Sequence, residues 1–280
     1  MNSISRQSAF SLIELSIVLV ILGLLVGGVL SGQSLIHASQ LRKVSADINT
    51  YKAAIYSFRD KYFALPGDMT NATAFWGLAG GTGAADGTDT TCYSTAGTGT
   101  ATCNGNGDGF ISGTGNGSGE PPRAWQHLAN AGLVAGSYAG NYAGGGANPS
   151  GYVPALSLSN GYIWLAAFMA SCGPGAQFFN ACYATSGSNY LFVGSYPTFG
   201  SGTAVTPGLL LSTEDAWNID TKMDDGLPQT GVVTSTGRII TGPAQYSKFC
   251  TVGTTSTDNM YQLDSSISSG PQCALAFRVN

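Results

Sequence analysis

The sequence predicts an α+β protein in which one long N-terminal helix packs on an antiparallel sheet. Three observations predict this fold. An apolar run begins the helix, an amphipathic pattern continues it, and the remaining chain alternates loops with short strand-like segments. With 280 residues, the chain is long enough to bury a sizeable core.

The apolar run spans residues 10–36 and contains a single ionisable residue, Glu14. About 20 apolar residues cross a bilayer as a helix, so this segment is long enough to span one. A short leader, 1–9, precedes it and carries Arg6, whereas all six cysteines lie after residue 90. This asymmetry predicts that the leader lies in the cytoplasm and the bulk of the chain outside it.

The helix is expected to continue as an amphipathic segment over residues 37–65. Apolar residues recur there at alternating intervals of three and four, which places them in one stripe on a helix. Nothing interrupts the pattern before Pro66-Gly67. We expect the stripe to pack on the globular region; its members are Leu41, Val44, Ile48, Tyr51, Ile55, Phe58 and Tyr62.

The remaining chain, 66–280, is predicted to form a globular extracytoplasmic domain with long loops. One short helix is expected over 123–131, with Trp125 and Leu128 facing inward, and another from Thr213, capped by Ser212 or Thr213 itself. An irregular surface loop is expected over 77–119, and strands over 162–170, 190–193, 232–240 and 273–279.

The charge distribution argues against nucleic acid as a partner of this domain. Only 9% of the residues are charged, and the chain after residue 65 holds twelve acids against five bases. Nucleic-acid binding depends on clustered lysine and arginine side chains that displace counterions. We therefore expect no nucleic-acid binding by the distal domain.

The six cysteines are even in number and suit disulfide bonds formed in an oxidising compartment. Zinc is the alternative, but no CxxC pair occurs, and His37 and His127 are far from the cysteines in the sequence. Sequence proximity favours the pairs Cys92–Cys103, Cys172–Cys182 and Cys250–Cys273.

The start of the apolar run, Ala9-Phe10-Ser11-Leu12-Ile13-Glu14-Leu15, resembles the cleavage and methylation motif of type IV pilins and type II secretion pseudopilins. The resemblance implies a pilin-like fold and a prepilin peptidase that cuts before Phe10 and methylates the new amine. It also implies that Glu14 meets the Phe10 amine of a neighbouring subunit. One departure is Ala9, because the family typically has Gly before the cut. A secretory signal peptide and a plain membrane anchor are the alternatives.

The resemblance predicts a structural protein, a subunit of a type IV pilus or of a type II secretion-like pseudopilus. Its partners would be further copies or other pilins, and its precursor would lie in the bacterial inner membrane with its bulk in the periplasm. The mature chain would reach a surface pilus or a periplasmic pseudopilus. The 215 residues of the distal domain favour a minor or tip subunit, or a specialised major pilin. The alternative is an adhesin or other binding module, anchored singly by the helix and not polymerised.

We expect no enzymatic activity. The sequence has no GxSxG, HExxH or GxxxxGK[ST] motif, which are typical of serine hydrolases, zinc peptidases and phosphate-binding loops. His127 lies in the predicted 123–131 helix, where a packed or surface role is favoured over that of a catalytic base.

No cofactor is required by this interpretation, but the loop 104–111 is a candidate calcium site. Its oxygen-bearing side chains alternate as in the first half of an EF-hand loop, and Gly109 allows a sharp turn. The twelfth position is Gly115, so Glu120 would have to fold back to supply the missing carboxylate. The alternative is a turn-rich loop without an ion. The candidate ligands are Asn104, Asn106 and Asp108, and a second acidic group, Asp220, Asp224 and Asp225, is expected to be a solvated helix end.

Overall fold

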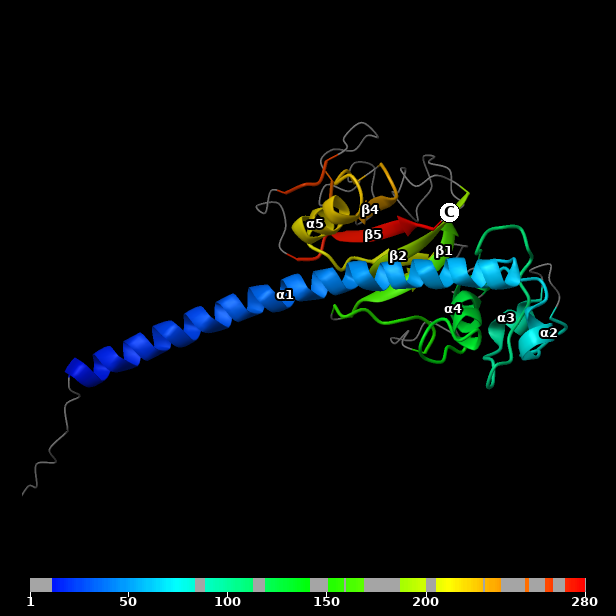
Figure 1. Cartoon of the computed structure of the whole chain (residues 1–280), viewed down its shortest axis with the longest axis horizontal. Helices are drawn as coiled ribbons and strands as arrows, with labels where there is room; N and C mark the ends of the chain where they lie inside the picture. Colours follow the sequence, from blue (N-terminus) through cyan, green and yellow to red (C-terminus); the bar gives the residue numbers. More distant parts are fainter. Residues whose placement is uncertain are drawn as a thin grey trace, which may run out of the picture. The chain divides into compact units, whose positions relative to one another are not determined.

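The computed structural model describes residues 12–83, 89–112, 119–141, 151–158, 160–168, 187–199, 205–228, 230–237, 250–251, 260–263 and 270–279. Its helices are α1 (Leu12–Tyr62), α2 (Ala72–Trp76), α3 (Thr90–Ser94), α4 (Glu120–Asn130) and α5 (Thr213–Met223). Its strands are β1 (Tyr162–Phe168), β2 (Ser188–Phe199), β3 (Val205–Gly208), β4 (Val233–Gly237) and β5 (Cys273–Arg278). The predicted α+β class is confirmed (Figure 1).

The chain divides into two units, Met1–Arg42 and Lys43–Asn280. The first holds the apolar beginning of α1, and the second holds the end of α1 and all the other elements. Helix α1 ends at Tyr62, three residues before the expected limit at residue 65, and the expected start at Phe10 lies outside the described residues.

The sheet is open and antiparallel, with the strand order β1-β2-β5-β4 and with β3 paired to the far end of β2. In β2, Leu191 lies opposite Leu165 of β1 and Phe277 of β5. Consecutive residues of the central strands are buried, so both faces of the sheet are covered.

Within the second unit, the end of α1 packs on α4 and β5. The Tyr51 ring meets the Trp125 ring edge to face at 5.1 Å between centroids. The Tyr56 hydroxyl donates a hydrogen bond to the carbonyl of Val279 at 2.5 Å. In this unit the predicted stripe is confirmed, because Val44, Ile48, Ile55 and Phe58 are buried, and Tyr51 and Tyr62 are half-buried. Leu41, the stripe residue that belongs to the first unit, is also buried.

The short elements differ most from the sequence prediction. Helix α4 begins at Glu120 rather than 123, because Pro121 and Pro122 occupy its first turn, where a missing N–H costs nothing. Strand β2 is longer than predicted, and α2, α3 and β3 were not predicted. Helix α3 lies inside the expected irregular loop, where the Asp89 carboxylate caps it by accepting from the Cys92 N–H at 3.0 Å.

Two of the three predicted disulfides are confirmed. Cys92 is bonded to Cys103, and Cys250 to Cys273. The third predicted pair, Cys172 and Cys182, lies outside the described residues.

Candidate functional site

The first half of α1 is an apolar surface with Glu14 in its first turn. The large hydrophobic side chains between Leu12 and Ile36 are all exposed. In the described part of the chain, α1 is the one helix that is long and apolar enough to cross a membrane, with a mean hydropathy of 2.6 over its most apolar window. The expected processing residues, Ala9 and Phe10, lie outside the described residues.

Four glycines in this segment, Gly23, Gly27, Gly28 and Gly32, pack against no other part of the described chain. A Cβ atom built on any of them would meet nothing within 4 Å. Glycine lowers helix stability by roughly 1 kcal/mol relative to alanine, so these four positions cost stability. Small residues spaced four apart let helices approach each other closely in lipid. Close packing against helices of other subunits would therefore explain these glycines.

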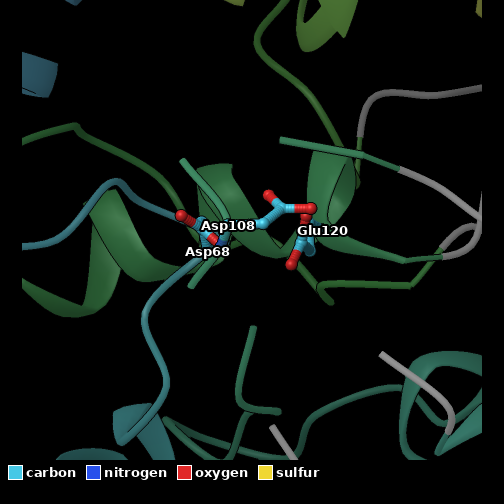
Figure 2. Close-up of side chains that lie close together, drawn as sticks. All are labelled: Asp68, Asp108 and Glu120. Atoms are coloured by element: carbon cyan, nitrogen blue, oxygen red, sulfur yellow. The ribbon is translucent and has the colours of Figure 1, made fainter. Parts of the chain in front are cut away.

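A second candidate site is a cluster of three carboxylates in the second unit, residues 43–280. Asp68 follows the end of α1, Asp108 lies in the loop of the predicted calcium pattern, and Glu120 is the first residue of α4. Their carboxylate oxygens lie within 4.8 Å of one another (Figure 2). Asp68 and Glu120 are buried, whereas Asp108 is exposed, so the cluster is open to solvent at one side.

Backbone amides of the loop fix the position of Asp68. Gly107 and Asp108 donate to its Oδ1 at 2.6 and 3.1 Å, and Gly109 donates to its Oδ2 at 3.0 Å. The turn before Asp68 needs glycine, because Gly67 has a φ of 89° and a Cβ there would lie 2.6 Å from the Glu120 carbonyl oxygen. The end of α1 and the loop are therefore held together through one carboxylate.

Glu120 joins the same loop to α4. Its Oε1 accepts from the Asn106 N–H at 2.9 Å and its Oε2 accepts from the Ser112 N–H at 2.8 Å. Burial raises the pKa of Glu120 to about 7 despite these hydrogen bonds, and burial also raises the pKa of Asp68. No basic side chain of the described residues forms an ion pair with any of the three acids. The arrangement is therefore a partly buried group of oxygen ligands with excess negative charge.

The raised pKa of Glu120 predicts a pH-dependent stability. Between the ordinary value of 4.5 and about 7, the folded chain holds a proton that the unfolded chain releases. The stabilisation is fully present below pH 4.5 and is lost as the pH rises through 7. Relative to Glu120→Gln, we expect the wild type to lose roughly 3 kcal/mol of unfolding free energy over this range in calcium-free buffer.

Urea unfolding of both full-length chains in detergent, followed by tryptophan fluorescence from pH 4.5 to 8, measures this difference. Comparison with the variant cancels the opposing effect of His127 and the parallel effect of Asp220, which both chains share. If the unfolding free energies of the two chains changed identically with pH, the raised pKa of Glu120 would be contradicted.

The structure gathers only part of the predicted ligand set. Asn106 and Asp108 lie in the cluster loop, where Asn106 Nδ2 donates to Asp108 Oδ2 at 2.9 Å. The Asn104 amide serves α2 and its neighbouring loop instead, accepting from the Thr73 N–H and donating to the Gly83 carbonyl. Glu120 does fold back to the loop, as the pattern required. Sequence reasoning missed Asp68, whose one signal is its place after Pro66-Gly67 at the end of the helix.

The second acidic group differs in part from its prediction as a solvated helix end, because Asp225 is exposed just after α5 but Asp220 is not. Asp220 is buried, because the Tyr261 hydroxyl covers it and donates to its Oδ2 at 2.7 Å. Burial raises the pKa of Asp220 to about 7. Asp224 accepts from the N–H groups of Val232 and Val233 at the start of β4, so it caps the outer edge of that strand. Each contact is structural, which explains these acids without a ligand.

His127 is a packed residue and not a base. Its Nδ1 accepts a hydrogen bond from the Gly67 N–H at 2.9 Å, so its proton is assigned to Nε2, which faces Thr102 Oγ1 at 2.9 Å and the Cys103 carbonyl at 3.2 Å. Burial lowers the pKa of His127 to about 3. The His127 ring is fully buried and neutral, and it joins α4 to the loop between Cys92 and Cys103, which we call the disulfide loop.

Comparison with known proteins gives one family match. Residues 4–30 match the family described as the prokaryotic N-terminal methylation motif. No curated protein and no solved structure matches the chain. The match covers most of the leader and of the apolar part of α1, including Ala9, Phe10 and Glu14, and does not extend to the distal domain.

Proposed function

Because the chain carries the N-terminal signature of type IV pilin and pseudopilin precursors, we propose that it is a filament subunit assembled through α1. In this proposal, a prepilin peptidase removes 1–9 and methylates the amine of Phe10. The precursor lies in the inner membrane with its distal domain in the periplasm, and the mature chain enters a surface pilus or a periplasmic pseudopilus. The observation that carries the proposal is the methylation motif at the head of an exposed, membrane-length apolar helix.

Electrostatics supports a paired role for Glu14 and the amine of Phe10. A carboxylate within a membrane segment is costly and is normally paired or functional. Cleavage before Phe10 creates a cation at the same depth, and N-methylation keeps its charge. Packing of neighbouring helices in a filament would place the two opposite charges together, which offsets the cost of burying each of them.

The intact mass and N-terminal sequence of the chain test this proposal. We expect material sheared from the cell surface, or pseudopili from the periplasm, to contain a chain that begins at N-methylated Phe10 and lacks 1–9. The membrane fraction should contain the same mature chain together with uncleaved precursor. A chain that keeps its leader, or that is cut beyond Gly32, would contradict filament assembly and leave a membrane-anchored or secreted module.

We also propose that the cluster of Asp68, Asp108 and Glu120 binds calcium as a structural ion. The donor set fits, because calcium takes carboxylate and amide oxygens, and Asn106 offers a further oxygen in the same loop. The buried carboxylates also lack a basic partner among the described residues, so a bound cation would lower the cost of their charge. Its role would be to hold the end of α1, the loop and α4 together.

Thermal unfolding of the full-length chain in detergent tests calcium binding. We expect about 1 mM calcium at pH 8 to raise the midpoint temperature by roughly 3–6 °C, with a smaller shift at pH 5, where Glu120 is protonated. Asp108→Asn removes an exposed carboxylate and should abolish the shift, whereas the matched control Asp225→Asn, in the second acidic group, should keep it. No shift in the wild type, or an equal shift in Asp108→Asn, would contradict this site.

A further inference from the structure

Exposed and half-buried apolar side chains from the end of α1, from α2 and from the residues that follow each helix form a group that we call the distal aromatic patch. The Tyr62 ring lies 5.5 Å from the Phe75 ring and 5.4 Å from the Trp76 ring, measured between centroids. Phe75 is 58% exposed and Leu78 is also exposed. Phe63, next to Tyr62 in the chain, is 92% exposed. The patch consists of Tyr62, Phe63, Phe75, Trp76 and Leu78.

Buried rings support the patch from below. Phe58 lies 4.6 Å from Tyr62, and His127 lies 5.3 Å from Trp76, again between ring centroids. Both supporting residues are fully buried, and His127 is fixed by its hydrogen bonds to Gly67 and the disulfide loop. The half-buried rings above them are therefore held in place before any partner binds, which lowers the entropic cost of binding.

Phe63 has no explanation in folding. Its φ of 53° is left-handed, and its N–H closes α1 by donating to the Arg59 carbonyl at 2.8 Å. Glycine is the usual residue at such a helix end, because a side chain there is strained. Phe63 keeps this strain and gains almost no burial. A large apolar side chain that is both strained and exposed, and that directly follows Tyr62 in the chain, marks an interaction surface.

We propose that the distal aromatic patch docks against the apolar segment 12–36 of a second copy of this chain, an inference that rests on the proposed filament function. That segment is the complementary surface, because its exposed hydrophobic side chains need cover once a subunit leaves the bilayer. The charges are compatible, since the segment has no basic side chain that would repel Lys61, whose Nζ lies 5.0 Å from the centroid of the Tyr62 ring.

The length of α1 allows this contact between different copies. From residue 24, the middle of the apolar segment, to residue 62, a helix rises by about 57 Å. Copies shifted along a filament axis by about this distance bring the apolar segment of one level with the patch of another. One patch residue, Tyr62, is the last residue of the helix whose beginning forms the proposed filament core, so this contact and the core contact would involve the same helix.

Photo-crosslinking in assembled filaments tests the inference. We would place p-benzoylphenylalanine at position 63, a conservative replacement for Phe63, in filaments assembled from a mixture of ¹⁴N and ¹⁵N chains. We expect crosslinked peptides of mixed isotope composition that join position 63 to the segment 12–36. The same probe at Met260, an exposed position outside the patch, should not reach that segment. Crosslinks from position 63 only to the distal domain, or none at all, would overturn the inference.

The substitution Phe63→Gly separates docking from folding. Glycine relieves the left-handed strain, so the variant should unfold at the wild-type temperature or a few degrees above it while forming about tenfold fewer filaments. Met260→Ser should leave filament number unchanged. A normal filament number in Phe63→Gly would overturn this inference alone. If the wild type forms no filaments, the proposed function fails, and this inference with it.

Discussion

Replacement of Glu14 by alanine is expected to abolish filament assembly while leaving insertion and leader cleavage intact. The variant leaves the Phe10 amine of each neighbouring subunit without its carboxylate in an apolar surrounding. Removing one partner of a buried charge pair costs about 3–5 kcal/mol, which corresponds to a loss of roughly 100-fold or more in assembly. The amount of filament sheared from the cells is measured by immunoblot, in cells that express only the variant chain.

A matched control comes from the same turn of the helix. Ser16 donates its hydroxyl to the Ile13 carbonyl within α1, so Ser16→Ala removes a polar group that has no need of a second subunit. We expect normal filaments from Ser16→Ala and a mature, membrane-bound chain from Glu14→Ala. Intact surface display of the Glu14→Ala chain, with no filaments from the wild type either, would instead favour a singly anchored binding module.

The long helix was predictable because its signals are local. The stripe from Leu41 to Tyr62 depends on spacing alone, and its burial follows from that spacing. Helix α5 was predictable for the same reason, since Ser212 caps it by accepting from the Asp215 N–H at 3.1 Å. The segments α2 and α3 have five residues each and too few turns to show a period, so the sequence pattern could not reveal them.

In helix α4, the hydrophobic pattern is not sufficient to predict which side chains are buried. The inward positions of Trp125 and Leu128 were predictable, but Arg123, Gln126 and His127 are buried as well. Such polar residues are rarely buried, and burial becomes favourable only when hydrogen-bond partners surround them. Those partners are backbone and side-chain groups of the loop between Cys92 and Cys103. Local sequence pattern cannot predict contacts that depend on the path of a distant loop.

The acidic groups show the same limit. The alternation of Asn106 and Asp108 was visible, yet Asp68 comes from the end of α1 and is brought in by its hydrogen bonds to Gly107 and Gly109. Asp220 was expected to belong to a solvated helix end. It is buried because Tyr261, 41 residues further along the chain, donates to it. In both places the tertiary contact, and not the local sequence, decides the environment of the carboxylate.

Replacement of Arg123 by methionine is expected to lower the free energy of unfolding by roughly 3 kcal/mol. The Arg123 guanidinium is fully buried, with Nη2 donating to the Cys92 carbonyl at 2.8 Å and to the Thr95 carbonyl at 2.5 Å. Its Nη1 donates to Gln126 Oε1 at 2.8 Å. Methionine fills a similar volume but leaves the two backbone carbonyls without these donors. Urea unfolding of the full-length chain in detergent measures the loss.

The change in unfolding free energy of Arg123→Met shows whether the hydrogen bonds from α4 to the disulfide loop add to stability. Burial lowers the pKa of Arg123 to about 10, so the group stays charged at neutral pH and its burial cost opposes its hydrogen bonds. The control Arg59→Met removes an exposed arginine of α1 and should change stability by less than about 0.5 kcal/mol. If Arg123→Met were as stable as the wild type, the two terms would cancel. Arg123 would then fix the position of the loop without adding to stability. A loss near 3 kcal/mol, together with faster reduction of Cys92–Cys103, would show that these hydrogen bonds outweigh the cost of burying the charge.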